Sequence, residues 1–252
     1  MSKVGWLSVF ALVACGDDTD VDDAGQNVSP ICTEPVAVPC EDEAFGALSL
    51  NEIEASSAMV STNQVGGIFR STVDATAGGF GAQPQGAYVY VRFRDSGLER
   101  LNLTDTEALS SMDWDMAFQR FRIRLNSGTS GPSCVAAARL PDDANFTSLD
   151  SAPENAEFRQ ENFFSSSCTV IADGANGPFG GPQFVMGGYY TYTTCLTMNG
   201  SVYIIQLANG RQVKFTVDSY YERSAQDACN SDSDTFAPTG SGTFAVNWAF
   251  LN

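Results

Sequence analysis

The first limit on the chemistry of this chain comes from a residue type that it lacks. None of its 252 residues is histidine, so a Ser-His-Asp or Cys-His catalytic group and a histidine-bound zinc or iron are excluded. The G-x-S-x-G and phosphate-binding glycine spacings are also missing from the sequence. Asp113 and Asp115 have a spacing that suits a pair of catalytic carboxylates, but the arginines that follow them favour ion pairs. We therefore predict that the protein is not an enzyme.

Seven cysteines form the next group of chemically capable residues. Cys15 ends an apolar run, which sets it apart from the other six. An even number of remaining cysteines is typical of disulfides in an exported protein. These six are Cys32, Cys40, Cys134, Cys168, Cys195 and Cys229. We predict three disulfides with their pairing left open, Cys32 to Cys40 being the most local option, and no zinc site, because no Cys-x-x-Cys is present.

Residues 1–14 are predicted to be a signal peptide. One basic residue, Lys3, precedes an apolar run from Val4 to Val13, which is too short to span a bilayer because a helix needs ~20 residues for that. The L-V-A-C sequence at its end resembles the lipobox of bacterial lipoproteins, and this resemblance implies that Cys15 carries a lipid and anchors the mature chain to a membrane. The alternative is an apolar N-terminus that is buried in the fold.

An acidic segment, residues 15–43, follows the signal peptide. From Gly16 to Glu43 it contains many acidic residues, neither Lys nor Arg, and few apolar residues, so we predict a solvated tether. Residues 44–252 are enough for one well-buried domain. The net charge of the chain is −17, which argues against nucleic acid as a partner.

A strict alternation of apolar and basic residues follows the two aspartates. Phe121, Ile123 and Leu125 fall on one face of the predicted strand, and Arg120, Arg122 and Arg124 fall on the other. Turn-forming residues at 126–132 then end the strand. Together with Arg92 and Arg94 of residues 86–94, these arginines form either a seat for carboxylates, which guanidinium groups bind in a bidentate way, or an outer sheet face with cross-strand ion pairs.

The remaining periodicity predicts an all-β protein of antiparallel strands. Residues 86–94 alternate as a strand. Residues 201–208 and 211–218 form the clearest hairpin, with Asn209 and Gly210 as a type I′ turn. The predicted core positions of the later strands are Val213, Phe215, Val217, Phe244, Val246, Trp248 and Phe250.

Helix and loop signals are few. Thr104 and Ser151 are each followed three residues later by Glu, the pattern of a capping box, so we predict one or two short helices, the second reaching about Phe164. Residues 172–188 are rich in glycine, which predicts a loop that can move or cover a site.

One long block resembles a known family. It matches the W-D-x-A-F/L-x-R-Y/F-x-x-R-x-N-x-G-x-S-G block of the HmuY-type haem-binding lipoproteins through Trp114, Asp115, Ala117, Phe118, Arg120, Phe121, Arg124, Asn126, Gly128, Ser130 and Gly131. The family's hairpin pattern is similarly matched by Val202, Tyr203, Ile205, Ala208, Gly210, Lys214 and Tyr220. The likeness runs from about Tyr88 to Phe250 and implies a HmuY-like β-sandwich.

The resemblance implies haem or a related tetrapyrrole as ligand. Family members hold the iron with side chains between the two blocks, which here means residues 133–200. Methionine and tyrosine are the implied axial ligand types that this segment contains. The implied cofactor-binding residues are Met186, Met198, Tyr189, Tyr190 and Tyr192, with Met186 and Met198 on the metal and Arg122 and Arg124 on the propionates. Each Met or Tyr has packing as its alternative role.

Two functions follow from this reading. In the first, the protein is anchored to the bacterial cell envelope, at the outer membrane or cell surface, holds the ring between the strands of residues 184–198 and passes it to an outer-membrane haem importer. In the second, the same fold is a disulfide-stabilised module for surface interaction or structure that binds no haem. Substitution of Met186 and Met198 separates the two, because only the first predicts a loss of affinity.

Overall fold

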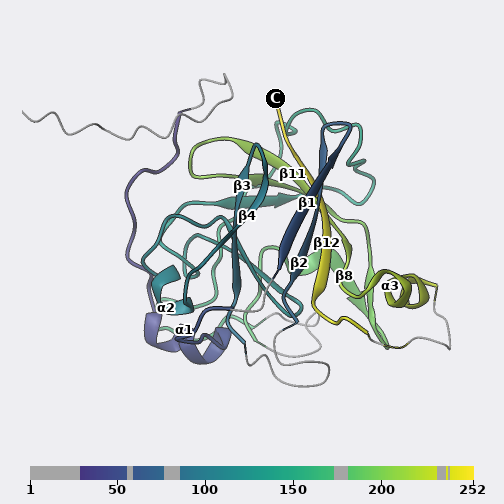
Figure 1. The fold of residues 1–252 in the computed structure, drawn as a ribbon. Helices are drawn as coiled ribbons and strands as arrows, with labels where there is room; N and C mark the ends of the chain where they lie inside the picture. The colour runs from purple at the N-terminus through teal and green to yellow at the C-terminus, as the bar shows by residue number, and fades with distance from the viewer. Residues whose placement is uncertain (1–28, 56–58, 77–85, 173–180, 232–236, 238) are drawn as a thin grey trace, which may run out of the picture.

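The computed structural model describes residues 29–55, 59–76, 86–172, 181–231, 237 and 239–252, which form antiparallel β-sheets with three short α-helices (Figure 1). The larger sheet contains β1 (Val60–Val65), β2 (Ile68–Asp74), β7 (Ala136–Arg139), β10 (Val202–Gln206), β11 (Gln212–Ser219) and β12 (Thr243–Phe250). Their spatial order is β1-β2-β12-β11-β10-β7. The predicted all-β, antiparallel class is confirmed.

A second sheet lies against the first. It contains β3 (Val89–Arg94), β4 (Gly97–Leu101), β5 (Met116–Gln119) and β6 (Arg122–Leu125), in the order β4-β3-β5-β6. A small separate sheet consists of β8 (Tyr190–Tyr192) and β9 (Leu196–Met198). The helices are α1 (Glu41–Leu48), α2 (Asp105–Ala108) and α3 (Arg223–Asn230). Helices α1 and α2 lie together on one side of the molecule, and α3 lies on the other side beside β8 (Figure 1).

Side chains of the two larger sheets meet in the main hydrophobic core. The Phe93 ring of β3 meets Trp248 of β12 edge-on at a centroid distance of 4.9 Å and Phe215 of β11 at 6.4 Å. Trp248 also stacks on Phe69 at 4.2 Å. Aromatic pairs of this kind add to the free energy gained from burial alone. The core positions predicted on β11, and those predicted on β12 up to Trp248, are confirmed as buried.

The opposite face of the smaller sheet is covered as well. Tyr88 and Tyr90 pack there with Leu48 of α1, Ala108 of α2 and Phe163. The indole N–H of Trp114 donates to the Ala108 carbonyl oxygen at 2.9 Å. Both faces of β3, β5 and β6 are therefore buried, which differs from a sheet with one face in water.

The predicted strand at residues 120–125 is in fact the end of a hairpin. Strands β5 and β6 pair with Gln119 opposite Arg122, so Arg120 and Phe121 form a two-residue turn. Arg120 has a φ of 53°, a conformation that non-glycine residues adopt uncommonly. No local signal predicts this turn, because the sequence lacks the Asn-Gly or Asp-Gly pair of most tight hairpins at this point.

The hairpin of β10 and β11 is confirmed, but its turn differs from the prediction. The Leu207 N–H donates to the Arg211 carbonyl oxygen, and the Gly210 N–H donates to the Leu207 carbonyl oxygen, both at 2.9 Å. Gly210 has a φ of 87°, whereas Asn209 keeps a negative φ. This geometry is a type I turn followed by a glycine bulge, and not the predicted type I′ turn, which needs positive φ at both residues.

One of the two predicted helices is present. Helix α2 begins after Thr104, and both hydrogen bonds of its capping box with Glu107 are formed. The helix predicted after Ser151 is wrong, because residues 151–164 form turns and isolated bridges. Phe158 of that segment packs against Ile204 on the outer face of the larger sheet, so tertiary packing holds the segment in place of helical hydrogen bonds.

The block around Trp114 is held together by its own side chains. The Asn126 amide donates to the Trp114 carbonyl oxygen at 2.8 Å and accepts from the Ser133 N–H at 3.1 Å. Gly128 has a φ of 56°, and a Cβ there would collide with the Glu161 carbonyl. The glycine is therefore required by both backbone conformation and close approach.

Three disulfides join the six predicted cysteines as Cys32–Cys134, Cys40–Cys168 and Cys195–Cys229. The most local pairing, Cys32 with Cys40, is therefore not formed. The first two bridges fasten the described end of the predicted tether to the domain, and the Ile31 N–H also donates to the Ala208 carbonyl oxygen at 2.8 Å. The segment that can act as a tether is thereby limited to residues before Cys32.

The signal peptide predicted for residues 1–14 and the predicted lipidation residue Cys15 lie outside the described residues. Within the described part of the chain, none of the helices has the length and apolar character needed to cross a membrane.

Candidate functional site

Residues 184–198, which contain the predicted iron ligands, run from a 3-10 helix, η2 (Gly187–Tyr189), into the hairpin of β8 and β9. Tyr190 lies opposite Met198 in this hairpin. The Cys195–Cys229 disulfide links the hairpin to α3, and the Gln226 amide of α3 donates to the Leu196 carbonyl oxygen at 2.9 Å. The hairpin is therefore fixed to a helix.

Met186 and Met198, the two predicted metal ligands, have different surroundings. Met186 is fully buried, with an exposed fraction of 0%, and belongs to the main core. Met198 is half-buried and packs against the same core from β9. Neither side chain is among the lining residues of three cavities that the described residues form. The structure thus gives Met186 a packing role and leaves Met198 the more accessible of the two.

The three tyrosines predicted to bind the cofactor are also unequal. Tyr189 is buried, its hydroxyl donates to the Phe121 carbonyl oxygen at 2.8 Å, and burial raises its pKa well above the ordinary value. Its ring meets that of Tyr190 edge-on at 4.8 Å. Tyr190 is half-buried, and 42% of Tyr192 is exposed. Tyr192 is therefore the most accessible phenol of this group.

Arg122 and Arg124 lie inside the protein, contrary to both sequence interpretations. The Arg122 guanidinium donates to the Leu48 carbonyl oxygen at 2.9 Å. Arg124 is fully buried, donates to the Tyr90 hydroxyl, and lies 4.5 Å from the centroid of the Tyr88 ring. Arg122 and Arg124 form neither a surface seat for carboxylates nor an outer face of ion pairs, because α1 and α2 cover them. Arg92 and Arg94 of β3 do form ion pairs, with Asp113 and Glu99, as the second interpretation predicted.

Asp113 and Asp115 do not form a carboxylate pair for catalysis. Asp113 is exposed and bonded to Arg92 at 2.5 Å. Asp115 is buried, accepts from the Phe93 N–H at 2.8 Å, and has a pKa raised by burial to about 6. The first therefore forms an ion pair, and the second holds β3.

A cavity in the described part of the chain lies beside β7. It has a volume of about 510 Å³, which falls in the range of ~300–1,000 Å³ typical of small-molecule sites. Its wall is formed by Ala137 and Arg139, by residues from 157–162, by Ile171 and by residues from 183–188. We call this space the β7 cavity. It touches the predicted ligand segment through Gly187 and Gly188.

Two arginines provide the positive charge of the β7 cavity. The Arg139 guanidinium donates to the Ser201 hydroxyl at 3.0 Å and to the Asp142 carboxylate at 2.9 Å. Arg159 pairs with Glu157 at 3.1 Å. The carboxylates of Asp142 and Glu157 are 89% and 80% exposed, so these are surface ion pairs of small net free energy.

A buried acid, Glu161, ties the cavity wall to the smaller sheet. Its carboxylate accepts from the Leu125 N–H of β6 at 3.1 Å and from the Val185 N–H at 3.0 Å. Burial raises its pKa to about 8, against the opposing effects of these N–H groups and of Arg124. Glu161 thereby connects the Trp114 block with the segment that ends at η2.

Sequence analysis missed Arg139, Arg159 and Glu161. Arg139 ends an apolar run, V-A-A-A-R, which is a weak strand signal that could have placed its side chain at a sheet edge. No local pattern marks Arg159 or Glu161, because the segment that carries them has no regular secondary structure. Their proximity to residues 183–188 depends entirely on the tertiary fold.

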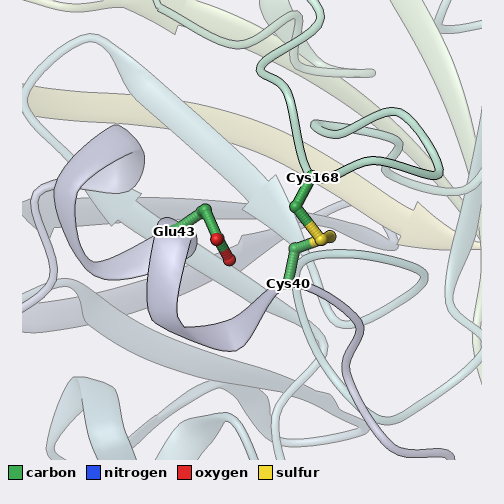
Figure 2. A group of neighbouring side chains, drawn as sticks. All are labelled: Cys40, Glu43 and Cys168. Carbon is green, nitrogen blue, oxygen red and sulfur yellow. A yellow bond between two sulfur atoms is a disulfide. The ribbon is translucent and has the colours of Figure 1, made fainter.

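One group of side chains has the composition of a metal site. Cys40, Glu43 and Cys168 bring their ligand atoms within 4.8 Å of one another, and Figure 2 shows the Glu43 carboxylate beside the Cys40–Cys168 bridge. Metals bind the thiolate form of cysteine, and here both sulfur atoms share a disulfide bond. The oxidised protein therefore offers a single carboxylate at this place.

Comparisons with solved structures give loose likenesses. A HmuY-like candidate haem-binding protein of Bacteroides vulgatus is 15% identical, with a TM-score of 0.43 over 72% of this chain and 91% of its own. A candidate lipoprotein of Bacteroides fragilis is 12% identical, with a TM-score of 0.44 over 74% and 90%. The apo HmuY analogue of Tannerella forsythia is 14% identical, with a TM-score of 0.40 over 78% and 97%.

Comparisons of sequence are more decisive. A search of curated proteins found no match. The family model described as HmuY protein matches residues 84–232, which span β3 to α3 and include the Trp114 block, the β7 cavity wall and the hairpin of β10 and β11. More than half of the chain is covered, and the chain therefore belongs to the HmuY family.

Proposed function

We propose that this protein binds haem or a related tetrapyrrole in the β7 cavity. The observation that carries the proposal is the cavity itself, with about 510 Å³ of space, two arginines at its wall and a glycine pair along one side. A tetrapyrrole is a flat apolar ring with carboxylates at one edge. Membership of the HmuY family supports the same ligand class.

The cavity has groups for both parts of such a ligand. Phe184, Val185 and Ile171 are apolar parts of its wall, and Gly187 and Gly188 leave backbone that a flat ring can approach closely. Arg139 and Arg159 suit carboxylates, because a planar guanidinium can donate two parallel hydrogen bonds to one carboxylate. Together these features match an amphipathic planar dianion.

The iron of haem has no equally clear partner. Axial haem ligands in proteins are His, Met, Cys or Tyr, and the described residues that line the β7 cavity include none of these. Met186 is adjacent in the chain to Gly187 but is fully buried. The proposal therefore rests on contacts to the ring and its carboxylates, and the predicted ligation by Met186 and Met198 is not part of it.

The first experiment is a titration of the full-length protein with haemin, followed by Soret absorbance. We expect a saturable, shifted Soret band with a one-to-one endpoint. Gly187→Leu should lower the affinity by about tenfold or more, because a side chain at this position enters the cavity rim; a Cβ there meets no atom closer than 3.8 Å, so the fold should tolerate it.

A matched control is Gly46→Leu in α1, where a Cβ would meet nothing within 4 Å. This variant should bind haemin like the parent protein. Equal affinity of both variants would place the ligand elsewhere. No Soret shift at all would reject tetrapyrrole binding and favour the alternative of a disulfide-stabilised surface interaction module.

We propose in addition that the protein is anchored to the bacterial cell envelope through a lipid on Cys15 and delivers its ligand to an outer-membrane haem importer. The L-V-A-C sequence and the three disulfides support export and anchoring. Cys15→Ser should move the protein from the membrane fraction to the soluble fraction, with haemin binding unchanged. Retention of the variant in the membrane fraction would contradict a lipid anchor at this residue.

A further inference from the structure

We propose that the β7 cavity recognises the carboxylates and the ring of a porphyrin and not its metal, so that metal-free protoporphyrin binds about as tightly as haemin. This inference rests on the proposed function, because it assumes that the cavity holds a tetrapyrrole. It goes beyond that function by stating which part of the ligand is selected and which two residues select it.

The first support is the composition of the cavity wall. Among the described residues that line it, none is Met, Tyr or Cys, and the chain has no histidine. The described wall of the cavity therefore offers no side chain of the types that ligate haem iron.

The second support is that residues of these types near the cavity wall are buried or already bonded. The Tyr203 hydroxyl lies 3.4 Å from the place where a Cβ of Gly188 would be, but its side chain is fully buried behind that wall. Burial raises the pKa of Tyr203 to about 12, which opposes the phenolate form that would bind iron. The Tyr189 hydroxyl is bonded to the Phe121 carbonyl oxygen, and Met186 is buried in the main core. Cys168, the nearest cysteine along the chain to Ile171, is bridged to Cys40. Moving any of these groups to an iron would break a bond or open the core, and each such change costs free energy.

The third support is the state of the two arginines. The Nε of Arg139 donates to the Ser201 hydroxyl, and its Nη2 donates to the Asp142 carboxylate. Its Nη1 lies 3.4 Å from the place where a Cβ of Gly188 would be. Arg159 uses Nη2 on Glu157. The backbone of Arg159 exchanges hydrogen bonds with that of Ala137 at 3.0 and 2.9 Å, which holds it beside β7.

The present partners of these guanidinium groups are easy to replace. The Asp142 and Glu157 carboxylates are largely exposed, and surface ion pairs of this kind contribute little net free energy. A ligand carboxylate that is held in the cavity can therefore displace them. Two arginines from different segments, β7 and residues 157–162, then match the two carboxylates along one edge of a porphyrin, in a protein whose net charge of −17 would otherwise repel a dianion.

The test compares two probes on the full-length protein. Haemin is titrated by Soret absorbance and metal-free protoporphyrin IX by fluorescence, in the same buffer. We expect dissociation constants that agree within about threefold. The double variant Arg139→Gln, Arg159→Gln should weaken both probes by about tenfold or more, because hydrogen bonds to charged groups are the stronger class.

Two controls separate charge and metal effects. Arg223→Gln removes one positive charge from α3, where the arginine pairs with Asp218 and Asp227, and should leave both affinities unchanged. Met198→Leu should also leave the haemin affinity and its Soret maximum unchanged. Circular dichroism of the double arginine variant checks that its fold is intact.

The outcomes distinguish this inference from the function on which it rests. Haemin binding that is about a hundredfold tighter than protoporphyrin binding, or a Soret maximum that shifts in Met198→Leu, would overturn metal-independent recognition and leave tetrapyrrole binding in place. Equal loss of affinity in Arg223→Gln would overturn the assignment to Arg139 and Arg159. Failure of both probes to bind would reject the proposed function itself.

Discussion

The arginines of β6 and those of the β7 cavity have the same guanidinium group but different surroundings and partners. Arg122 and Arg124 are buried, and they bind a backbone carbonyl, a tyrosine hydroxyl and aromatic faces. Arg139 and Arg159 keep 43% and 73% of their side chains exposed and have surface carboxylates as partners. The first pair stabilises the fold, whereas the second pair remains exchangeable.

The difference comes from what covers each strand. Helix α1 and helix α2 close the outer face of the smaller sheet, so that Arg124 lies among Tyr88, Tyr90 and Trp114. At the end of β7 the wall is made of turns and bends, and space remains. A row of basic residues on a strand therefore does not by itself predict a ligand site, because other elements of the fold can cover that face of the strand. The following predictions test this contrast, from the largest expected effect to the smallest.

The free energy of unfolding should depend strongly on pH because of the buried carboxyl group of Glu161. The pKa of Glu161 is about 8 in the folded protein and 4.5 as its ordinary value, so the folded state binds a proton that the unfolded state releases between these values. Stability should be highest below about pH 4.5 as far as this group is concerned, and should fall as pH rises through 8, by an amount on the order of 4 kcal/mol. Urea unfolding between pH 5 and 9 measures it.

The variant Glu161→Gln is the control for this pH dependence. It cannot ionise, so its free energy of unfolding should change much less between pH 5 and 9. A parent protein whose stability is constant or rises over this interval would contradict the assignment.

Truncation of the buried arginine should cost nearly as much. Arg124→Ala removes a donor to Tyr90 and a cation packed against three aromatic rings, and it leaves a cavity. We expect a loss of ~3–5 kcal/mol in the free energy of unfolding, measured in urea. A loss below 1 kcal/mol would show that Arg124 is not part of the packed interior.

The second buried arginine should have an intermediate effect. Arg122→Gln loses the bonds to the Leu48 carbonyl oxygen and the Ser49 hydroxyl, which join β6 to the end of α1. We expect ~1–3 kcal/mol of destabilisation. Hydrogen exchange should show faster opening of α1 in this variant, and unchanged exchange in α1 would argue that other contacts hold the helix.

The cavity arginine should have the smallest effect on the fold. Arg139→Gln should alter the free energy of unfolding by no more than about 0.5 kcal/mol, although together with Arg159→Gln it should weaken the proposed porphyrin binding. A destabilisation as large as that of Arg124→Ala would remove the distinction between the two groups of arginines.

Parts of the fold that depend on neighbours in the chain could be predicted from the sequence. The capping box of Thr104 and Glu107 spans three residues, and the hairpin of β10 and β11 needs a turn close to Gly210. The burial of Phe215 and Trp248 follows from strict alternation on strands that face the main core. The even number of cysteines likewise predicted three disulfides, though not their pairing.

Features that depend on contacts between distant segments could not be predicted from the sequence. The carbonyl oxygen that Arg122 binds belongs to a residue 74 positions earlier, so its burial has no local signal. The β7 cavity is assembled from four separate stretches, one of which, residues 157–162, has a capping-box pattern upstream that misleadingly favoured a helix. Met186 was predicted as an iron ligand, and its burial in the main core depends on side chains from distant strands that no local pattern reveals.

The position of the first disulfide also determines how the domain responds to mechanical load. A force applied to the residues before Ser29 reaches the domain at Cys32. The covalent bond to Cys134 then transmits this force to the loop that follows β6. Helix α1 begins nine residues further along the chain, at Glu41, and so lies beyond this covalent connection. A protein held by its N-terminus is therefore fastened through a covalent bond to the loop after β6, before any helix or strand of the domain carries the load.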